Sequence, residues 1–508
     1  MRPLEILLMI ANLATFFVLA IPRLRAVRWM GYAAVLLLLI AGMQVLVEGF
    51  RWQMIPAYVL SGLFFLGGLL QTIAPASVPA GGGLNNRLFV GLAIGLGVLG
   101  LALSIVLPIV LPVFRLPQPS GPYAIGTLTY HWVDNARREI FTDDPNDRRE
   151  LMVQIWYPAA GNPSSPRAPY VPDPRVLAGL LRLIHAPEFL FDQFKYVNTH
   201  AIPSAPAADG ELSYPVLIFA SGRGGFRQES THMFEELASH GYVIAAIDQP
   251  YASTGVIFPD GRLVTLDARL LPGPTGGLPA DRKFFDDVVI PYLAKDVIFT
   301  LDQLTVLNQA DPNGILTGRL DVQRAGIFGP SLGGLIGAEA CYMEPRLRVL
   351  LAMDVHMPAD VVRAGLKQPT MFISREAKWM QLEHWTQADI DLTTTTMRAV
   401  YDRLPGDGYL VLVPGMFHPN FSDAALYSPL FSWLGLTGPI DGDRANSIIG
   451  SYTLAFFDKH LKGQPAPLLD GPSKQYPEVH FETRRSEFTT SMCMSTTVSP
   501  IPETAKCK

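Results

Sequence analysis

One serine in the chain lies between two glycines in a pattern that suits nucleophilic chemistry. Ser331 is the centre of a Gly-Pro-Ser-Leu-Gly sequence, with Gly329 two positions before it and Gly333 two positions after it. A sharp turn that lifts a serine hydroxyl clear of a sheet needs small residues at these positions, because larger side chains would clash. Such a turn joins a strand to a helix, and here a β-rich run at residues 324–328 precedes the serine and an apolar helical run follows it. The pattern predicts that Ser331 is a nucleophile; a helix N-cap in a glycine-rich turn is the alternative.

An acid and a base follow this serine in the order that a hydrolase triad requires. A serine attacks well only when a base takes its proton and a carboxylate fixes that base. Asp354 ends the apolar run at residues 349–353, and His418 follows the expected strand at residues 410–413 in a Pro-Gly-Met-Phe-His loop. The carboxyl ends of parallel strands collect functional groups at one edge of a sheet. We therefore predict a triad of Ser331, Asp354 and His418.

The other histidines are weaker candidates for the base. His356 stands two residues from Asp354, too close along an extended chain for easy bonding, although it is placed to line the pocket. His232 and His240 belong to an expected amphipathic helix and are interpreted as structural. The remaining six occupy no strand-end loop that would bring them to the site: His131, His185, His200, His384, His460 and His480.

Acyl transfer also needs hydrogen-bond donors for the oxyanion that forms on the carbonyl oxygen. The amide after the nucleophile, that of Leu332, is the first expected donor. A glycine-rich loop at residues 221–226 follows the expected strand at residues 216–219, and its Arg223 amide is the second. A phosphate-binding loop is also rich in glycine, but no Gly-Lys-Ser/Thr sequence follows this one.

The elements that must position these residues form an alternating pattern after residue 121. Short β-rich runs separated by helical runs predict an α/β domain with a mostly parallel sheet. The eight expected strands are residues 126–132, 151–157, 216–219, 243–247, 325–328, 349–353, 370–374 and 410–413. The expected helices are residues 229–240, 281–308, 332–343 and 446–461. Residues 118–122 read as a linker and residues 159–174 as a Pro-rich loop, and the pocket walls are expected from residues 176–195 and 266–283.

Four apolar stretches without charged residues fill the first quarter of the chain: residues 6–21, 29–47, 52–74 and 88–114. The last three reach the roughly 20 residues that a bilayer core requires, and the first is slightly shorter. Charged or polar segments separate them, as at the ends of membrane helices. We expect a transmembrane region over residues 1–116 with four helices. A signal peptide would not explain three further spans, and buried soluble helices normally keep a polar face.

The arginines around these stretches predict an orientation. The first and third loops hold one more arginine than the opposite side: Arg23, Arg25, Arg28 and Arg87 against Arg2, Arg51 and Arg115. Basic loops tend to stay in the cytoplasm. The hydrolase domain, residues 117–470, is then expected outside the cytoplasm in a multi-pass protein of the cell membrane. Residues 471–508, whose end is rich in Ser, Thr and Pro, are expected to form a flexible extension.

Charge and cysteine content exclude other classes of protein. A net charge of −5 and the lack of a long basic run give no field for nucleic acid. The three cysteines show neither CxxC spacing nor a neighbouring histidine cluster, so neither a zinc site nor a disulfide framework is predicted. Cys341 is expected to be a buried small residue, and Cys493 and Cys507 could pair or stay free.

Residues 121–465 resemble the platelet-activating factor acetylhydrolase family, the plasma-type and isoform II group of the α/β-hydrolases. The resemblance is carried by Leu-Met-Val-Gln-Ile-Trp-Tyr-Pro at residues 151–158, Tyr-Pro-Val-Leu-Ile-Phe at 214–219, Gly-Arg-Gly-Gly-Phe-Arg at 222–227, Leu-Ala-Ser-His-Gly-Tyr at 237–242, Gly-Pro-Ser-Leu-Gly-Gly at 329–334, Leu-Ala-Met-Asp at 351–354, and His418 followed by Asn-Phe-Ser-Asp at 420–423. It implies the same triad, the same two oxyanion amides, and neither a metal nor an organic cofactor. Two departures, Pro330 and Ser221 where the family usually has histidine, lie beside the acyl site.

The resulting expectation is a membrane-anchored serine hydrolase that cleaves short-chain acyl esters. A phospholipid with a short or oxidised sn-2 chain is the substrate that the resemblance implies. A dienelactone-hydrolase-like carboxylesterase, a polyester hydrolase or a peptidase would use the same fold. An inactive, membrane-tethered binding module is the alternative from another class. A channel is disfavoured, because the apolar stretches contain no Asp, Glu, Lys, Arg or His. The oligomeric state is left open.

Overall fold

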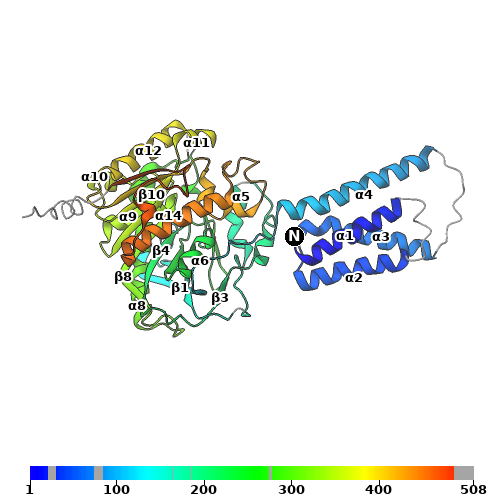
Figure 1. The fold of residues 1–508 in the computed structure, drawn as a ribbon, viewed down its shortest axis with the longest axis horizontal. Coiled ribbons are helices and arrows are strands. Elements are labelled where there is room, and N and C mark those ends of the chain that lie inside the picture. The colour runs from blue at the N-terminus through cyan, green and yellow to red at the C-terminus, as the bar shows by residue number, and fades with distance from the viewer. Residues whose placement is uncertain (21–29, 74–83, 163, 184, 274–276, 485–508) are drawn as a thin grey trace, which may run out of the picture.

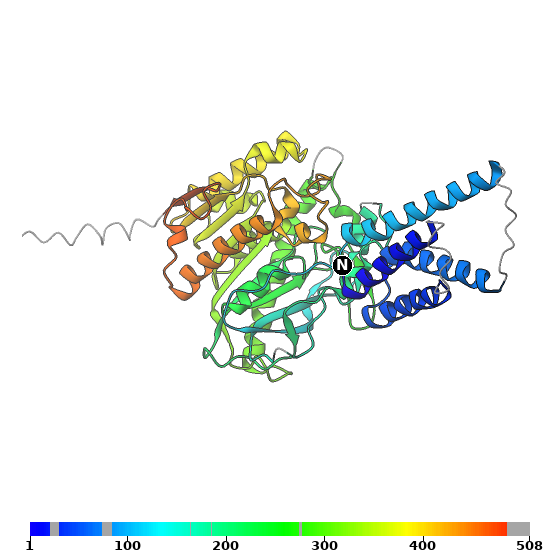
Figure 2. The same cartoon turned by 45° about the vertical axis from the view of Figure 1, so that its right-hand side comes forward.

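The computed structural model describes the chain apart from residues 21–29, 74–83, 163, 184, 274–276 and 485–508. A bundle of four apolar helices projects from one end of a larger α/β domain (Figure 1). A second view shows the four helices side by side, with the N-terminus at the end of the bundle that meets the α/β domain (Figure 2). The bundle helices are α1 (Pro3–Ala20), α2 (Met30–Glu48), α3 (Ile55–Ile73) and α4 (Leu84–Val110).

The described part of the α/β domain is built on a sheet of ten strands in the order β12-β11-β10-β9-β8-β4-β5-β2-β1-β3. The six strands from β11 to β5 are mutually parallel. Their carboxyl ends therefore lie along one edge of the sheet. The strands are β1 (Ala124–Arg138), β2 (Arg148–Ala159), β3 (Ala201–Pro203), β4 (Tyr214–Ala220), β5 (Val243–Asp248), β8 (Leu320–Pro330), β9 (Leu347–Met353), β10 (Thr370–Ser374), β11 (Gly408–Leu412) and β12 (His480–Arg484). A separate hairpin consists of β6 (Gly255–Ile257) and β7 (Leu263–Thr265).

Helices cover both faces of this sheet. Successive strand residues point to opposite faces, so Ile218 of β4 packs in the cluster that holds α8, α9 and α12, whereas Phe219 packs in the cluster of α6 and α14. Because both faces are covered, the central strands are apolar along their length. The helices are α5 (Ala178–Leu183), α6 (Thr231–Ser239), α7 (Arg282–Phe284), α8 (Ile290–Gln309), α9 (Leu332–Met343), α10 (Ala359–Ala364), α11 (Ala377–Leu382), α12 (Gln387–Tyr401), α13 (Ala424–Tyr427) and α14 (Gly442–Lys462).

All eight strands expected from the sequence overlap strands of the sheet, but two edge strands were not expected. β3 has only three residues, too few for a periodic signal. β12 lies within residues 471–508 and pairs antiparallel with β11, so the expectation of a flexible extension is wrong for His480–Arg484. Most side chains of β12 are charged or polar, as in a solvated tail, so the sequence shows no strand pattern here. Charged residues are common on exposed edge strands, because they prevent pairing with other chains.

Three helical segments of the described bundle are long and apolar enough to cross a membrane: Pro3–Ala20, Trp52–Leu70 and Leu88–Val110. The described apolar part of α2, Val35–Glu48, is shorter, so the expected fourth span is not confirmed. The first-loop arginines Arg23, Arg25 and Arg28 lie outside the described residues, as do Cys493 and Cys507.

The chain leaves the bundle earlier than expected. α4 ends at Val110, and Phe114 is only 7% exposed in an apolar cluster of the α/β domain with Tyr170, Phe194 and Tyr427. The end of the predicted membrane stretch 88–114 therefore packs against protein. This cluster fixes the exit of the bundle to the domain.

Polar contacts complete the junction between the two parts. The Gln53 side-chain amide donates to Oε1 of Gln193 at 2.8 Å, and the Tyr196 hydroxyl donates to the carbonyl of Phe50 at 2.9 Å. Inside the same end of the bundle, the fully buried Arg51 and Glu5 form an ion pair at 2.8 Å. The segment between α2 and α3 thus contacts the domain through the Gln53 side chain and the Phe50 carbonyl.

Candidate active site

Ser331 occupies a tight turn between β8 and α9. Its backbone angles are φ +53° and ψ −128°, a conformation that a non-glycine residue adopts only under constraint. A Cβ atom on Gly333 would lie 1.9 Å from the carbonyl oxygen of Ala220, and one on Gly329 would lie 2.2 Å from the same atom. The two glycines let the turn press against the end of β4. This close approach is the physical reason for the Gly-x-Ser-x-Gly spacing.

Asp354 directly follows β9, one strand further along the sheet edge, and its carboxylate is buried. Oδ1 accepts a hydrogen bond from the Ser374 hydroxyl at 2.9 Å, and Nε of Arg375 lies 3.1 Å from Oδ2. Burial by itself raises the pKa of this carboxyl, but the positive charge of Arg375 and the hydrogen bond from His418 lower it to about 2. Asp354 is therefore ionised at neutral pH.

His418 begins the short turn that follows β11 and reaches the same edge of the sheet. Its Nδ1 lies 2.7 Å from Oδ2 of Asp354, and its ring meets that of Trp385 edge to face at 5.3 Å. An ionised carboxylate can only accept, so Nδ1 carries the proton in this pair. The lone pair of neutral imidazole is then on Nε2, the nitrogen that a general base uses.

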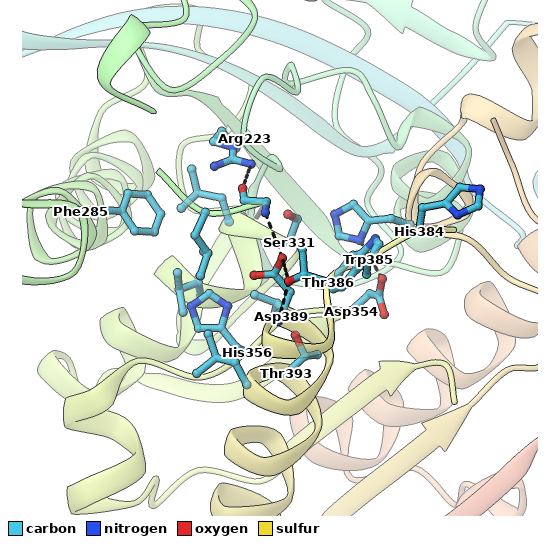
Figure 3. Close-up of a pocket in the computed structure, with 17 residues that line it drawn as sticks. Arg223, Phe285, Ser331, Asp354, His356, His384, Trp385, Thr386, Asp389 and Thr393 are labelled. Atoms are coloured by element: carbon cyan, nitrogen blue, oxygen red, sulfur yellow. Dashed lines mark hydrogen bonds and ion pairs between the residues drawn. The ribbon is translucent and has the colours of Figure 1, made fainter. Parts of the chain in front are cut away.

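Ser331, Asp354 and His418 line one cavity of about 350 Å³ (Figure 3). Among the described residues no hydrogen bond joins the Ser331 hydroxyl to the His418 ring. Such catalytic contacts are often long without a substrate and tighten when one binds. The structure thus brings the three predicted residues to one place and links two of them directly.

The loop that was expected to supply an oxyanion donor lies against the serine. A Cβ atom on Gly222 would be 3.4 Å from Cβ of Ser331, and Arg223 lines the cavity. Leu332 opens α9, so its amide is one of the helix N–H groups that have no intrahelical partner. No hydrogen bond from the Arg223 amide occurs within the described part of the chain. Both amides are therefore available to a ligand.

The buried carboxyl group of Glu229 forms hydrogen bonds with backbone amides of this loop. Oε1 of Glu229 accepts a hydrogen bond from the Gly222 amide at 2.9 Å, and its other oxygen lies 3.4 Å from the Phe226 amide. Burial, together with the carboxylates of Asp423 and Asp248, raises the pKa of Glu229 to about 8 against the effect of the two amides. This residue was not predicted from the sequence.

Both apolar and polar side chains line the cavity. Six apolar side chains line it: Leu278, Phe285, Leu332, Leu335, Val355 and Leu392. Asp389, Thr393 and His356 are among its polar lining residues (Figure 3). The wall expected from residues 266–283 is confirmed by Gly277, Leu278 and by the neighbouring Phe285. The wall expected from residues 176–195 is wrong, because the described residues of that segment pack instead against the bundle exit.

Two other histidines belong to the cavity. His356 lines it as expected; burial and the nearby Arg282 lower its pKa to about 4, so it is neutral at pH 7. His384 also lines it, although the sequence placed it in no strand-end loop. His232 is buried and paired with Asp423, in agreement with a structural role. Cys341 is a buried free thiol, as expected.

Four supporting residues were not predicted: Ser374, Arg375, Glu383 and Trp385. Ser374 ends the strand β10 and Arg375 directly follows it, and β10 lies between the strands that precede Asp354 and His418. A charged residue directly after a buried strand was the available signal. In the described residues, no His, Cys, Asp and Glu side chains form a group of three that could hold a metal ion.

Comparison with known proteins relates this chain to one family of ester hydrolases. Residues 109–257 and 302–466 match the sequence profile of the family described as "Platelet-activating factor acetylhydrolase, isoform II". The platelet-activating factor acetylhydrolase of Cavia porcellus is 25% identical over 68% of this chain and 78% of its own length. A probable 1-alkyl-2-acetylglycerophosphocholine esterase of Arthroderma benhamiae is 24% identical over 72% of this chain and 94% of its own.

A solved structure gives the same result for the fold. The ferulic acid esterase of Streptomyces cinnamoneus superposes with a TM-score of 0.58 and 28% identity, covering 73% of this chain and 99% of that one. These relatives are ester hydrolases, and the matched segments include the whole predicted triad. The chain belongs to the platelet-activating factor acetylhydrolase isoform II family and is a carboxylic ester hydrolase.

Proposed function

We propose that the protein is a membrane-anchored serine esterase that cleaves short-chain acyl esters with a triad of Ser331, Asp354 and His418. The observation that carries this proposal is the 2.7 Å contact between His418 and the buried Asp354 at the rim of the cavity that Ser331 lines. Asp354, ionised at neutral pH, fixes the imidazole and stabilises the imidazolium that forms during the reaction.

The reaction proceeds in two steps. Oγ of Ser331 attacks the ester carbonyl carbon while Nε2 of His418 takes the hydroxyl proton. The carbonyl oxygen becomes an oxyanion that accepts hydrogen bonds from the amides of Arg223 and Leu332. The carbon–oxygen bond to the leaving alcohol breaks, and the alcohol takes the proton from His418. His418 then deprotonates a water molecule, which attacks the carbonyl carbon of the acyl-serine. The bond between this carbon and Oγ of Ser331 breaks, Oγ takes the proton back from His418, and the carboxylic acid leaves.

The proposed substrate is a phospholipid with a short or oxidised sn-2 acyl chain. The cavity of about 350 Å³ has apolar side chains in its lining, which suit the acyl group of an ester. Two relatives support this choice, one named a platelet-activating factor acetylhydrolase and one a probable 1-alkyl-2-acetylglycerophosphocholine esterase. The solved ferulic acid esterase supports a second candidate, a phenolic or other non-lipid ester.

A substrate series separates these candidates. Full-length protein in detergent would be assayed with p-nitrophenyl acetate, butyrate and octanoate, with a 1-alkyl-2-acetyl phosphocholine lipid, and with methyl ferulate. We expect acetate and the acetyl lipid to have the highest kcat/KM. Preference for methyl ferulate would instead favour the second candidate, and a preference for octanoate would contradict the short-acyl site.

Membrane anchoring is proposed from the outward surface of the bundle. Leu46 of α2 is 87% exposed, Phe89 and Leu92 of α4 are 71% and 62% exposed, and many neighbours are similar. Water contact with such a continuous apolar surface is unfavourable by roughly 25 cal/mol per Å². A bilayer around residues 1–116 removes this cost. The bundle then forms one region, and the α/β domain, residues 117–470 with β12, forms the other.

The proposed topology places the α/β domain outside the cytoplasm. The ends of α2 and α4 that meet the domain are on one side of the bundle. On that side, Arg2 and Arg51 form ion pairs with Glu5. Arg23, Arg25 and Arg28 follow α1 in the sequence, and basic loops tend to stay in the cytoplasm. In a variant whose three native cysteines are replaced by serine, single cysteines introduced at Gln118 or within the first loop would be labelled in intact cells with an impermeant maleimide. Labelling at Gln118 alone is expected; labelling at the first loop alone would reverse the topology.

A further inference from the structure

His418, Asp354, Arg375 and Glu383 form a closed ring of hydrogen bonds and ion pairs, which includes the backbone amide of His418. Arg375 Nε lies 3.1 Å from Oδ2 of Asp354, and its Nη1 forms an ion pair with the Glu383 carboxylate. Oε2 of Glu383 accepts a hydrogen bond from the backbone amide of His418 at 3.0 Å. The ring closes through the bond from His418 Nδ1 to Asp354 at 2.7 Å.

The ring is built into the protein interior. The side chains of Arg375 and Asp354 are fully buried, and that of Glu383 is 17% exposed. Trp385 covers the ring, with its indole 4.8 Å from the guanidinium carbon of Arg375 and 5.3 Å from the His418 ring. A guanidinium has the fixed planar fork that can engage two carboxylates at once, which a lysine ammonium does not reproduce.

The four groups of the ring carry a net negative charge when His418 is neutral. Asp354 and Glu383 supply two negative charges, and Arg375 supplies one positive charge. Protonation of His418 during catalysis adds the second positive charge. Without Glu383, Arg375 would offset the charge of Asp354 and would oppose the imidazolium at short range. With Glu383 present, the second carboxylate offsets the charge of Arg375, so the ring favours a positive charge on His418.

We propose that Arg375 and Glu383 are positioning residues of the esterase, which together hold His418 against Asp354 and balance charge around the imidazolium. This proposal rests on the proposed triad, because it assigns a role to the neighbours of its acid and base. Neither residue lines the cavity, so they act through His418 and Asp354 rather than on the substrate.

The two residues have opposite charges, which gives a test that a merely structural role would not pass. The charged and titratable groups facing His418 are Asp354, Arg375 and Glu383 within the ring, and His384, Asp389, His356 and Arg223 around the cavity. Glu383→Gln keeps an acceptor for the His418 amide but removes a negative charge. Arg375→Met removes the positive charge, and Arg375→Lys keeps the charge but loses the fork.

The experiment measures kcat, KM and the pH profile of kcat/KM for p-nitrophenyl acetate, normalised to active sites by titration with a fluorophosphonate. In Glu383→Gln, the acidic limb of kcat/KM should move to lower pH by about half a unit to one unit, because the imidazolium loses a favourable charge. In Arg375→Met it should move to higher pH by a similar amount. In Arg375→Lys the limb should stay in place while kcat falls about tenfold or more with little change in KM.

Glu376→Gln is the matched control, since it makes the same chemical change one residue after Arg375. The Glu376 carboxylate pairs with His480 at 2.8 Å and with Lys378, away from the cavity. This variant should keep the wild-type profile. If Arg375→Met does not fold, Arg375→Lys and Glu383→Gln still test the proposal.

The outcomes separate this proposal from the proposed function. If Ser331→Ala removes hydrolysis but Glu383→Gln and Arg375→Lys keep kcat within twofold and an unchanged pH profile, the positioning role is overturned and the triad stands. Shifts in the same direction for Glu383→Gln and Arg375→Met would also overturn it. If Ser331→Ala leaves hydrolysis intact, the triad fails and this role fails with it. Opposite shifts in an enzyme that requires Ser331 support both.

Discussion

His418 Nδ1 lies 2.7 Å from Oδ2 of Asp354, although the two residues are 64 positions apart in the chain. Their contact follows from the order of the sheet. Asp354 follows β9 and His418 follows β11, and these strands flank β10 in parallel. The carboxyl ends of three neighbouring strands therefore lie together. The strand order sets the distance between the two residues, and their side chains, which follow these strands in the sequence, supply the chemistry.

Asp354→Asn tests this relationship. An amide can neither orient the Nδ1–H tautomer nor stabilise an imidazolium as a carboxylate does, so we expect kcat to fall by about 10³–10⁴-fold. The measurement is p-nitrophenyl acetate hydrolysis at pH 7 to 8 on protein whose thermal unfolding matches that of the wild type. A variant that keeps more than a tenth of the wild-type kcat would contradict the assignment of Asp354.

Gly333→Ala tests the packing of the nucleophile turn. The added Cβ would lie 1.9 Å from the Ala220 carbonyl oxygen, and that oxygen belongs to a central strand that cannot move freely. We expect loss of folded protein or a fall in the free energy of unfolding of about 3 kcal/mol or more. Differential scanning calorimetry and solubility after expression measure this.

Gly450→Ala is the control for that substitution. Gly450 lies inside α14, and a Cβ there would have no atom within 4 Å. Alanine is a better helix former than glycine, so the variant should be more stable by up to about 1 kcal/mol. Equal effects of the two substitutions would refute the packing explanation of the glycine spacing.

Glu229→Gln tests the buried acid below the oxyanion loop. The pKa of this carboxyl rises from 4.5 in an ordinary setting to about 8 in the folded protein. The unfolded chain therefore releases this proton at lower pH than the native state does, and the contribution of Glu229 to stability declines as pH rises from about 4.5 to about 8. Glutamine is neutral throughout and keeps an acceptor for the Gly222 amide. The variant should gain stability over the wild type at alkaline pH, by up to about 5 kcal/mol.

The comparison is a series of thermal unfolding curves for both proteins between about pH 5 and pH 9. The difference in Tm should grow with pH and level off above the raised pKa. A difference that is constant with pH, or a variant that becomes relatively less stable at alkaline pH, would show that Glu229 is ionised in the folded protein.

Membrane insertion of the bundle is tested by extraction. Integral segments resist washing with alkaline carbonate and are released by detergent, because their apolar surface stays in the bilayer. We expect the full-length protein to remain in the membrane pellet after carbonate and to enter the supernatant only with detergent. Release by carbonate alone would contradict the proposed spans and favour a bundle covered by protein.

The sequence predicted those parts of the site in which one residue type at one position has a direct steric or chemical reason. Ser331 with its two glycines, and an acid and a histidine after successive strands, were recognisable for this reason. Arg375 and Glu383 were not predicted, because their role depends on which way a side chain turns at the end of β10 and on where α11 ends. Neither feature produces a periodic pattern in the sequence from which it could be predicted.

The same limit explains the errors in the fold. Residues 176–195 were expected to line the pocket, but their apolar side chains found a different partner in Phe114 at the exit of α4. Hydropathy counts apolar residues and does not distinguish lipid from protein as their surroundings. For that reason residues 111–114 were assigned to the membrane stretch although they pack on the α/β domain.

Labelling with a fluorophosphonate probe tests the central claim most directly. The probe forms a covalent bond with an activated serine, so the full-length wild-type protein in detergent should be labelled, and hydrolysis of p-nitrophenyl acetate should stop as labelling completes. Ser331→Ala should lose both labelling and hydrolysis while it unfolds at the wild-type temperature. Labelling that persists in Ser331→Ala would place the nucleophile elsewhere, and a folded wild type that neither labels nor hydrolyses esters would contradict the account.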